Sequence, residues 1–491
     1  MPDAQRQDPK ATTSVEARLE KSVLEEMITQ VEKGAPAKAE DTALMMMVNS
    51  LVKTGAKLQT STIDELIANI DQKLSKQVDT VLHHPDFQRL ESAWRSLRYI
   101  VEQTDFRQGN KMAILDVSKD DLIRDLEDNP DITKTGYYRH VYSDGLGTFG
   151  GIPTGTVVAN YEFGPGQRDI RLLRKVGAVS SMAHAPFISG TAPQMFGLDT
   201  YRDLPNMRDL KDVFEGAKFA AWRGFRDEAD ARYVGLALPR YLARPVYTRD
   251  SVKKFVFDET VSESHEHFLW GNMAFPFATR LTEAFAKNRW CANIIGPNSG
   301  GAVKGLPVHV YQDEGAEVMK IPTEVKITLR REYELAESGF MPLTWRENSD
   351  NAAFFGANSA KRTKVFPDTP AGRTAATNDM LGTRLPYMFI VCRLAHYIKA
   401  IQIENIGKSI SRAALEKELV EWISQYVNPL ENLSQIEMAR KPLKQAMIAV
   451  KDVEGKPGWY EVEMQVTPHF KYEGAYFTLS LVGKMDNTQK K

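Results

Sequence analysis

The chain has 491 residues, of which 42% are hydrophobic and 26% are charged, and its formal net charge is −1. This composition is typical of a globular protein of roughly two to four domains, and the balanced charge argues against a nucleic-acid-binding protein. The N-terminus has no apolar signal core and no apolar run near it could span a bilayer, so we expect a cytoplasmic protein without membrane insertion.

The first sixty residues are expected to form a flexible N-terminal helical segment. Residues 1–14 are polar, whereas apolar residues recur at helical spacing over 15–31 and again over 42–53. The first of these helical pieces ends at Gly34-Ala35-Pro36, and neither piece has enough apolar residues for a core of its own. We therefore assign 1–60 as a segment separate from the folded body.

Two stronger helices are predicted within 61–105, and together they indicate a helical hairpin. The first covers 62–82, where Thr62 and Glu65 make a capping-box pattern. His83-His84-Pro85 ends it, and Pro85 is well placed as the first residue of the second helix. Apolar residues follow at spacings of three and four: Phe87, Leu90, Trp94, Leu97 and Val101.

From 106 to 380 the pattern changes to that of a mixed α/β body. The predicted strands are 112–117, 138–142, 156–163, 231–242, 308–311 and 325–329. The main predicted helices are 118–126, 168–182 and 265–287, and Pro276 is expected to bend the last of them. The stretch 356–380 is rich in Gly, Pro, Asn and Thr and is predicted to be a long connector.

The C-terminal region, 381–491, is predicted to contain helices over 386–405 and 410–427, followed by a three-stranded β-meander. Its second strand, 459–467, alternates cleanly between apolar and polar residues. A weaker strand around Ala446, Ile448 and Val450 precedes it, and a third strand follows it. The side chains on one face of the second and third strands are Tyr460, Val462, Met464, Val466, Phe477, Leu479 and Leu481.

Such a meander has two open edges, and two interpretations of it remain. The sheet is covered within its own domain, or an open edge pairs with a strand of another chain. The pattern by itself favours the first interpretation.

A search for motifs of catalysis or ligand binding assigns no catalytic, cofactor-binding or metal-binding residue. The Gly-x-Gly-x-x-Gly stretch 145–150 is not followed by a helix, and 296–301 lacks the lysine of a phosphate-binding loop. His265-Glu266-His267 has the wrong spacing for a zinc protease and is expected to cap a helix or lie at the surface. The two cysteines, Cys291 and Cys392, lack metal-site spacing and are expected to be buried free thiols. We therefore expect a protein that is not an enzyme and has no cofactor.

Several motifs, in the same order along the chain, resemble the large subunit of the type VI secretion contractile sheath, the TssC/VipB family. The resemblance runs from about residue 62 to the end. It departs from the family at 241–247, where the family usually has a more apolar run before Pro-Tyr. The motifs that carry it are His84–Gln88, Glu91–Leu97, Met182–Phe187, Asp230–Leu236, Leu238–Arg240, Leu269–Asn272, Asn351–Phe355, Arg384–Tyr387 and Glu454–Tyr460.

The resemblance implies a contractile tail-sheath-like fold and a structural role. It implies pairing with a small sheath subunit, stacking on neighbouring sheath protomers around a hexameric inner tube protein, and assembly on a baseplate. It also implies recycling of the contracted sheath by an AAA+ unfoldase. In the family, C-terminal strands link neighbouring protomers, so the resemblance favours the open-edge interpretation of the meander. The alternatives are an enzyme with an unrecognised α/β active site and a scaffold protein that does not polymerise.

Overall fold

A computed structural model describes residues 60–251, 255–262, 264–313, 316–347, 349, 351–430, 433–456 and 458–469. Its contacts divide the chain into two compact units. Among the described residues, the smaller unit holds 60–78 and parts of 249–258, and the larger unit holds 79–248 and the chain from 259 onward.

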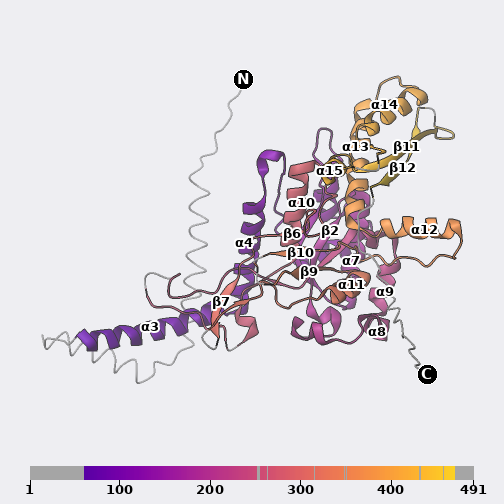
Figure 1. The fold of residues 1–491 in the computed structure, drawn as a ribbon. Coiled ribbons are helices and arrows are strands. Elements are labelled where there is room, and N and C mark those ends of the chain that lie inside the picture. The colour runs from indigo at the N-terminus through magenta and orange to yellow at the C-terminus, as the bar shows by residue number, and fades with distance from the viewer. Residues whose placement is uncertain are drawn as a thin grey trace, which may run out of the picture. The chain divides into compact units, whose positions relative to one another are not determined.

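The helices and strands are labelled in Figure 1, where space allows. The helices are α3 (Thr60–Leu82), α4 (Pro85–Gln103), α5 (Lys119–Asp128), α6 (Gly136–Tyr138), α7 (Gln167–Ala183), α8 (Leu210–Glu215), α9 (Ala220–Asp227), α10 (Ala274–Asn288), α11 (Leu329–Glu337), α12 (Pro370–Leu381), α13 (Leu385–Asn405), α14 (Arg412–Ser424) and α15 (Gln435–Arg440). The strands are β1 (Val157–Phe163), β2 (Phe187–Thr191), β3 (Val234–Leu238), β4 (Tyr241–Leu242), β5 (Trp270–Gly271), β6 (Ala302–Val303), β7 (His309–Asp313), β8 (Ala316–Lys320), β9 (Met341–Trp345), β10 (Ala352–Phe354), β11 (Leu443–Asp452) and β12 (Tyr460–Pro468).

The smaller unit is built on the N-terminal part of α3. This helix begins at Thr60, two residues before the predicted cap at Thr62. The Asp71 carboxylate accepts a hydrogen bond from the backbone N–H of Val256 at 3.3 Å, and the Ser75 hydroxyl donates to the carbonyl oxygen of Val256 at 3.3 Å. These two bonds attach the 249–258 segment to α3.

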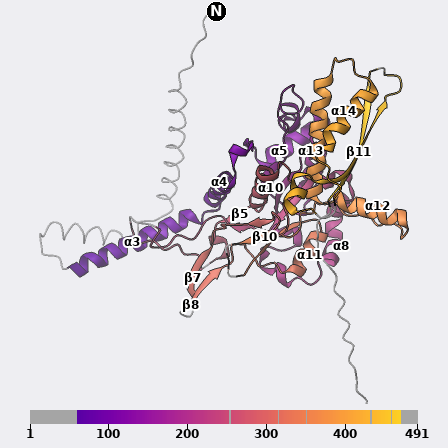
Figure 2. The same cartoon turned by 45° about the horizontal axis from the view of Figure 1, so that its top comes forward.

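The larger unit is organised around a six-stranded mixed sheet of order β1-β2-β3-β9-β10-β6. β1, β2, β3 and β9 run parallel, and β10 and β6 are antiparallel to their neighbours. Short hairpins lie outside this sheet, and the one formed by β7 and β8 projects from the body of the unit (Figure 2). The mixed α/β class predicted from the sequence is confirmed.

Helices cover both faces of the central sheet. Successive side chains of a strand point to opposite faces, so alternate residues pack in two different cores. On β3, Val234, Leu236 and Leu238 pack with α5, α7 and α9, whereas Ala237 belongs to the core formed with α10 and the start of α13. Gly235 lies on the second side, where a Cβ atom would come within 2.8 Å of the side chains of Ile188 and Leu385. A side chain at this position would therefore displace the ends of these two side chains.

The predicted strand over 138–142 is wrong, because this stretch is helical. Thr135 caps α6 by accepting the N–H of Tyr138 at 3.1 Å. The Asp125 carboxylate, which lies on α5, accepts the N–H groups of Gly136 and Tyr137, both at 2.9 Å. A cap donated by another element thus starts a helix where β-branched and aromatic residues predicted a strand.

The predicted long helix over 265–287 is also wrong. A 3₁₀ turn at His265–His267 and strand β5 precede α10, which begins only at Ala274. β5 pairs with β4, and Gly271 is needed there because a Cβ atom would come within 2.6 Å of the Tyr241 ring. Pro276 falls in the first turn of α10, where its missing N–H breaks no helical bond, so no bend is required.

Three further sequence predictions of the body are corrected by the structure. Residues 112–117 and 325–328 are not strands, and Leu329 already belongs to α11, which Thr328 caps. The predicted connector 356–380 contains α12, capped by the Thr369 hydroxyl and started by Pro370. That Thr-Pro pair is a helix-start signal in the sequence, and the high Gly, Asn and Thr content concealed it.

Candidate assembly interface

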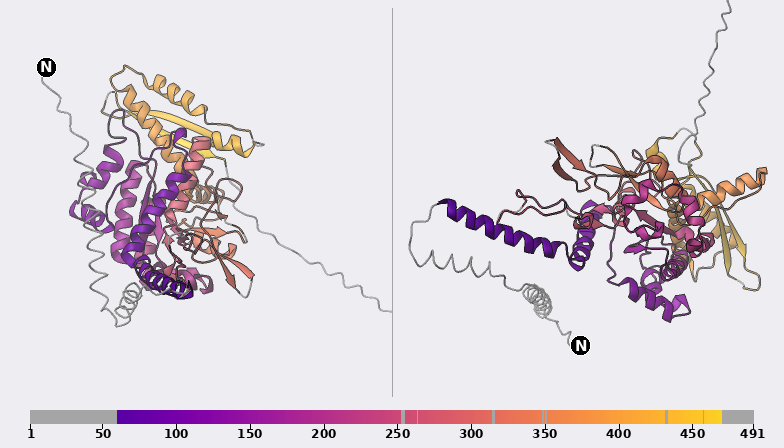
Figure 3. Two further views of the ribbon diagram at one scale, coloured as in Figure 1. Left: turned by 90° about the vertical axis from the view of Figure 1, so that its left-hand side faces the viewer. Right: turned by 90° about the horizontal axis from the view of Figure 1, so that it is seen from below.

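β11 and β12 form an antiparallel hairpin near the end of the described chain, with register pairs from Leu443–Pro468 to Asp452–Tyr460. Figure 3 shows the yellow hairpin beside the orange helices α13 and α14. The turn contains Gly455 and Gly458 with φ of 78° and 81°, a region that favours glycine. The first two predicted strands and their turn are therefore confirmed.

One face of the hairpin packs on the C-terminal helices. Tyr460, Val462, Met464 and Val466 are half-buried against a cluster that includes Leu415, Leu419 and Ile423 of α14 and Ile448 and Val450 of β11. The intervening residues of β12 are exposed. The structure thus brings these four predicted residues together, whereas Phe477, Leu479 and Leu481 lie outside the described residues.

The direction of the backbone groups follows from two side-chain contacts on β11. Arg412 donates to the carbonyl oxygen of Val450 at 3.3 Å, and the N–H of Val450 donates to the Glu416 carboxylate at 3.4 Å. Both backbone groups of Val450 therefore point away from β12. In an antiparallel pair the residue opposite shares this property, and it recurs every second residue. Val462 and Met464, opposite Val450 and Ile448, thus direct their N–H and C=O groups to the outer edge of β12.

Both outer edges of the hairpin carry backbone groups that have no hydrogen bond to another described residue. On β11 these groups belong to Ala446 and Ile448. On one side of them Val450 bonds to Arg412 and Glu416, and on the other side Leu443 bonds to the backbone of Tyr426 and Asn428. On β12 such groups belong to the four residues whose side chains face the helices: Tyr460, Val462, Met464 and Val466. The side chains of these four residues therefore pack in the local core, and their backbone N–H and C=O groups line the outer edge of β12.

Helix α13 joins this C-terminal region to the sheet of the larger unit. Its first residues, including Leu385 and Phe389, lie in the core against α10, and Ile390 and Leu394 lie in the core with α14 and the hairpin. The His396 ring nitrogen Nε2 lies 2.8 Å from the carbonyl oxygen of Ala183 at the end of α7. α13 thus attaches the hairpin to the central body, and Trp290 and Ala292, which follow α10, also pack in the hairpin core.

A buried network of charged side chains, which the sequence did not reveal, holds the region beside α4. The Arg244 guanidinium donates to both carboxylate oxygens of Glu259 at 2.6 and 2.8 Å and to Glu91 at 2.9 Å. The His83 ring lies 3.4 Å from Glu259 and stacks on His267, with ring centroids 4.0 Å apart. His267 is therefore half-buried between the His83 ring and the carbonyl oxygen of Thr260, which lies 3.0 Å from its Nδ1 atom.

This network predicts that the protein loses stability as the pH falls below about 6.5. Burial and the neighbouring His267 lower the pKa of His83 from its ordinary 6.5, although Glu259 and Asp79 oppose the shift. A histidine with a lowered folded pKa favours the neutral form, so protonation penalises the folded state from the unfolded pKa downward. Burial raises the pKa of Glu259, but the hydrogen bonds and charge of Arg244 hold it below 4.5, so its contribution is lost only at lower pH.

The melting temperature of purified protein between pH 8 and pH 5 measures this effect. We expect a fall between pH 6.5 and 5.5 that is smaller in His83→Gln, which cannot be protonated. An equal pH dependence in both proteins would contradict the assignment to His83.

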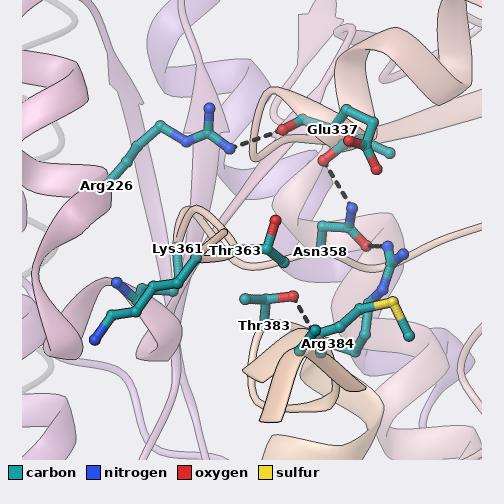
Figure 4. Close-up of a pocket in the computed structure, with 11 residues that line it drawn as sticks. Arg226, Glu337, Asn358, Lys361, Thr363, Thr383 and Arg384 are labelled. Atoms are coloured by element: carbon teal, nitrogen blue, oxygen red, sulfur yellow. Dashed lines mark hydrogen bonds between the residues drawn. The ribbon is translucent and has the colours of Figure 1, made fainter. Parts of the chain in front are cut away.

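A cavity of about 230 Å³ lies where α9, the end of α11 and the 358–364 segment meet (Figure 4). Arg226 donates to the carbonyl oxygens of Ala360 at 3.0 Å and Glu337 at 2.7 Å, and Asn358 accepts from Arg384. Burial, together with the charge of Arg362, lowers the pKa of Arg226 to about 10. Arg226 and Lys361 thus bond to backbone oxygens and hold the 358–364 segment against α9.

The other motifs considered from the sequence lie in loops and turns. The glycine-rich stretch 145–150 forms turns after a π-helical turn at Arg139–Ser143, and the 296–301 loop precedes β6. Cys291 and Cys392 are free thiols, and burial raises the pKa of each to about 12. In the described part of the chain no group of three or more His, Cys, Asp or Glu side chains could hold a metal ion. None of the described helices is long and apolar enough to cross a membrane.

The larger unit thus combines an α/β body with a hairpin whose outer edges have no partner among the described residues, and comparisons with known proteins identify the family. The family model described as EvpB/VC_A0108, tail sheath N-terminal domain, matches residues 64–361. The model described as EvpB/VC_A0108, tail sheath gpW/gp25-like domain, matches residues 374–485. The chain is 38% identical over 436 residues to the type VI secretion system sheath protein TssC1 of Pseudomonas aeruginosa, covering 87% of this chain and 86% of that protein.

The chain therefore belongs to the EvpB/VC_A0108 family of tail sheath proteins, the large-subunit family of the type VI secretion sheath, and its function is that of a structural sheath protein. The resemblance seen in the sequence motifs is confirmed. A chain of the anti-feeding prophage baseplate in a cryo-EM structure also matches, with a TM-score of 0.35 and 7% identity over 64% of this chain and 66% of that chain. A similarity this weak adds nothing to the assignment.

Proposed function

We propose that this protein pairs with a small sheath subunit, polymerises with it into a helical tubule around an inner tube, and drives the tube outward when the tubule contracts. The observation that carries the proposal is the pair of outer edges of the β11–β12 hairpin. Each presents N–H and C=O groups without a partner among the described residues. A strand of a neighbouring subunit satisfies such groups directly.

The attachment of the hairpin suits a link that must survive contraction. Main-chain hydrogen bonds each contribute about 0.5–1.5 kcal/mol net, so several in register are needed to hold a neighbouring strand. α13 is the element that shares residues between the central core and the hairpin core. A rotation of the body about this helix would leave the paired strands in place, and contraction would repack the contacts between bodies.

The further partners are proposed on the basis of the family. They are a hexameric inner tube protein, a baseplate on which the sheath assembles, and an AAA+ unfoldase that dismantles the contracted form. In this proposal the chain acts through its surfaces and its assembly, without catalysis.

Co-expression with the gene of the small subunit tests the proposal. We expect hollow tubules by negative-stain electron microscopy and co-purification of the two chains. A monodisperse, soluble monomer that does not bind the small subunit would contradict the proposal.

Residues 1–60 are expected to be dispensable for the tubule. The apolar residues of the two predicted helical pieces are too few for a core, and Gly34-Ala35-Pro36 and Gly55 separate them from the body. A chain that begins at Ser61 should therefore form tubules with the small subunit in an amount similar to that of the full chain, counted on the same grids. Loss of all assembly on this truncation would show that the segment packs into the body.

A further inference from the structure

The segment from Lys111 to Asp116 is an exposed stretch of backbone without a partner among the residues that the structure describes. It runs between η1 (Phe106–Gln108) and α5 with no helix, turn or bend from Asn110 to Ser118, and its six residues are all exposed. None of the six has a hydrogen bond to another described residue. The sequence predicts a strand over 112–117, and no described strand lies beside this segment.

Both ends of this segment are held in place. The Asn110 side chain donates to the carbonyl oxygens of Asp105 at 3.0 Å and Thr282 at 3.2 Å. At the other end, the Tyr161 hydroxyl donates to the carbonyl oxygen of Val117 at 2.7 Å, and Val117 packs against the core beside the sheet. A segment without a turn or bend that is held at both ends needs little further ordering before another strand joins it, which lowers the entropic cost of pairing.

The side chains of the segment also indicate a contact surface. Met112, Ile114 and Leu115 are 36%, 72% and 47% exposed. Three large apolar side chains within six residues are costly to leave in water, whereas a paired strand and its side chains would cover them. An added strand is also the partner that satisfies consecutive backbone N–H and C=O groups.

The charged residues at the two ends of the segment indicate which charges a partner strand would carry. Lys111 and Asp116 form no ion pair with a described residue. An antiparallel partner would carry a basic residue opposite Asp116, an acidic residue opposite Lys111, and apolar residues between them. A second copy of this segment would meet that description, but two copies would pair about a two-fold axis, and such a closed pair cannot propagate along a polar tubule.

We propose that residues 111–116 are an acceptor strand for a β-strand of the small sheath subunit, a second site of strand pairing separate from the C-terminal hairpin. The proposal rests on the proposed pairing of the two subunits. It assigns one extended strand of the small subunit, apolar at its centre and oppositely charged at its ends, to this segment.

Two adjacent proline substitutions test the proposal, because only one of two neighbouring N–H groups can point to the edge that receives the partner strand. Neighbouring residues of a strand direct their N–H groups to opposite edges, and proline removes that group. Of Ala113→Pro and Ile114→Pro, we expect one to lower recovery of the small subunit in a pull-down by about tenfold and the other by about threefold or less. Ile114→Ala, which keeps the N–H, controls for loss of the side chain. Tolerance of both prolines, or equal loss from both, would overturn strand pairing.

Hydrogen exchange measured by mass spectrometry on the unmodified co-expressed complex gives a second, independent readout. We expect about half of the amides of 111–116 to be protected, because a strand paired at one edge protects alternate residues. Unprotected exchange throughout the segment in a complex that contains both subunits would overturn the proposal and leave the proposed function intact. Protection in this chain alone would assign the segment to a second copy and overturn the small subunit as its occupant. Failure of the unmodified chains to co-purify would instead refute the proposed function.

Discussion

Protein carrying Met464→Pro is expected to fold and to bind the small subunit but to form no long tubules. Met464 lies opposite Ile448 in a pair whose backbone groups point away from the hairpin, so proline removes a donor from the outer edge of β12 and leaves the β11–β12 ladder intact. If that edge receives the third strand predicted for the meander or a strand of a neighbouring subunit, the missing bond and the proline ring both weaken the sheet that links the subunits. Electron microscopy of the co-expressed proteins measures tubule length and number.

Two variants separate the edge from the packing of the side chain. Met464→Ala loses the contacts with the α13–α14 core but keeps the N–H, so it should lower stability and still give tubules. Glu463→Ala changes an exposed residue whose side chain pairs with Lys451 at 2.6 Å, and it should have little effect. Full-length tubules from Met464→Pro would refute the proposed role of this edge.

The opposite edge of the hairpin offers a matched comparison. Ala446 directs its backbone groups outward from β11, and its small side chain contributes little to the core. Ala446→Pro therefore removes an edge donor with minimal repacking. If both edges receive strands, Ala446→Pro and Met464→Pro should shorten tubules to a similar extent. If Ala446→Pro has no effect, only the β12 edge is used.

Replacement of Arg244 by methionine is expected to destabilise the protein by about 3–5 kcal/mol, because it leaves the buried Glu259 carboxylate without its cation. The side chains of Arg244 and Glu259 are 3% and 0% exposed, and two hydrogen bonds join them. The loss should lower the melting temperature by about 5 °C or more. Differential scanning fluorimetry of the purified protein measures this effect.

The double substitution Arg244→Met with Glu259→Met is the decisive control. It removes both charges and fills the space with apolar atoms, so it should restore most of the stability lost in the single variant. Glu91 keeps a partner in the double variant, since Arg95 lies 2.7 Å from it. A double variant less stable than Arg244→Met would show that the network stabilises the fold through more than the neutralisation of Glu259.

Much of the C-terminal region could be predicted from the sequence, because its signals are local. The alternation of Tyr460, Val462, Met464 and Val466 with polar residues indicated a half-buried strand, and β12 has this pattern of burial. The helix predicted over 386–405 is likewise present as α13. The alternation could not predict whether the N–H and C=O groups of the β12 residues point towards the paired strand or towards the outer edge. The contacts of Arg412 and Glu416 with the backbone of Val450 show that direction.

Two of the failed predictions share one cause, which is that a residue outside the stretch decides its local structure. Asp125 caps the helix at 136–138, and the pairing of Tyr241 and Leu242 with Trp270 and Gly271 divides the predicted helix over 265–287. The buried network around Arg244 likewise joins residues from α4 and from two later loops. The hydrophobic periodicity of a segment does not predict which distant residue will contact it.

By itself, the sequence determined the class of fold, the family and the residues of the C-terminal hairpin that face the helices, because periodicity and motifs depend on neighbours along the chain. The tertiary structure alone decided which backbone edges have no partner among the described residues, which charges are buried together, and that the predicted strand at 112–117 lies unpaired. These features depend on pairing between residues far apart in the chain, and a strand acquires its hydrogen bonds only from a neighbour that the fold brings beside it.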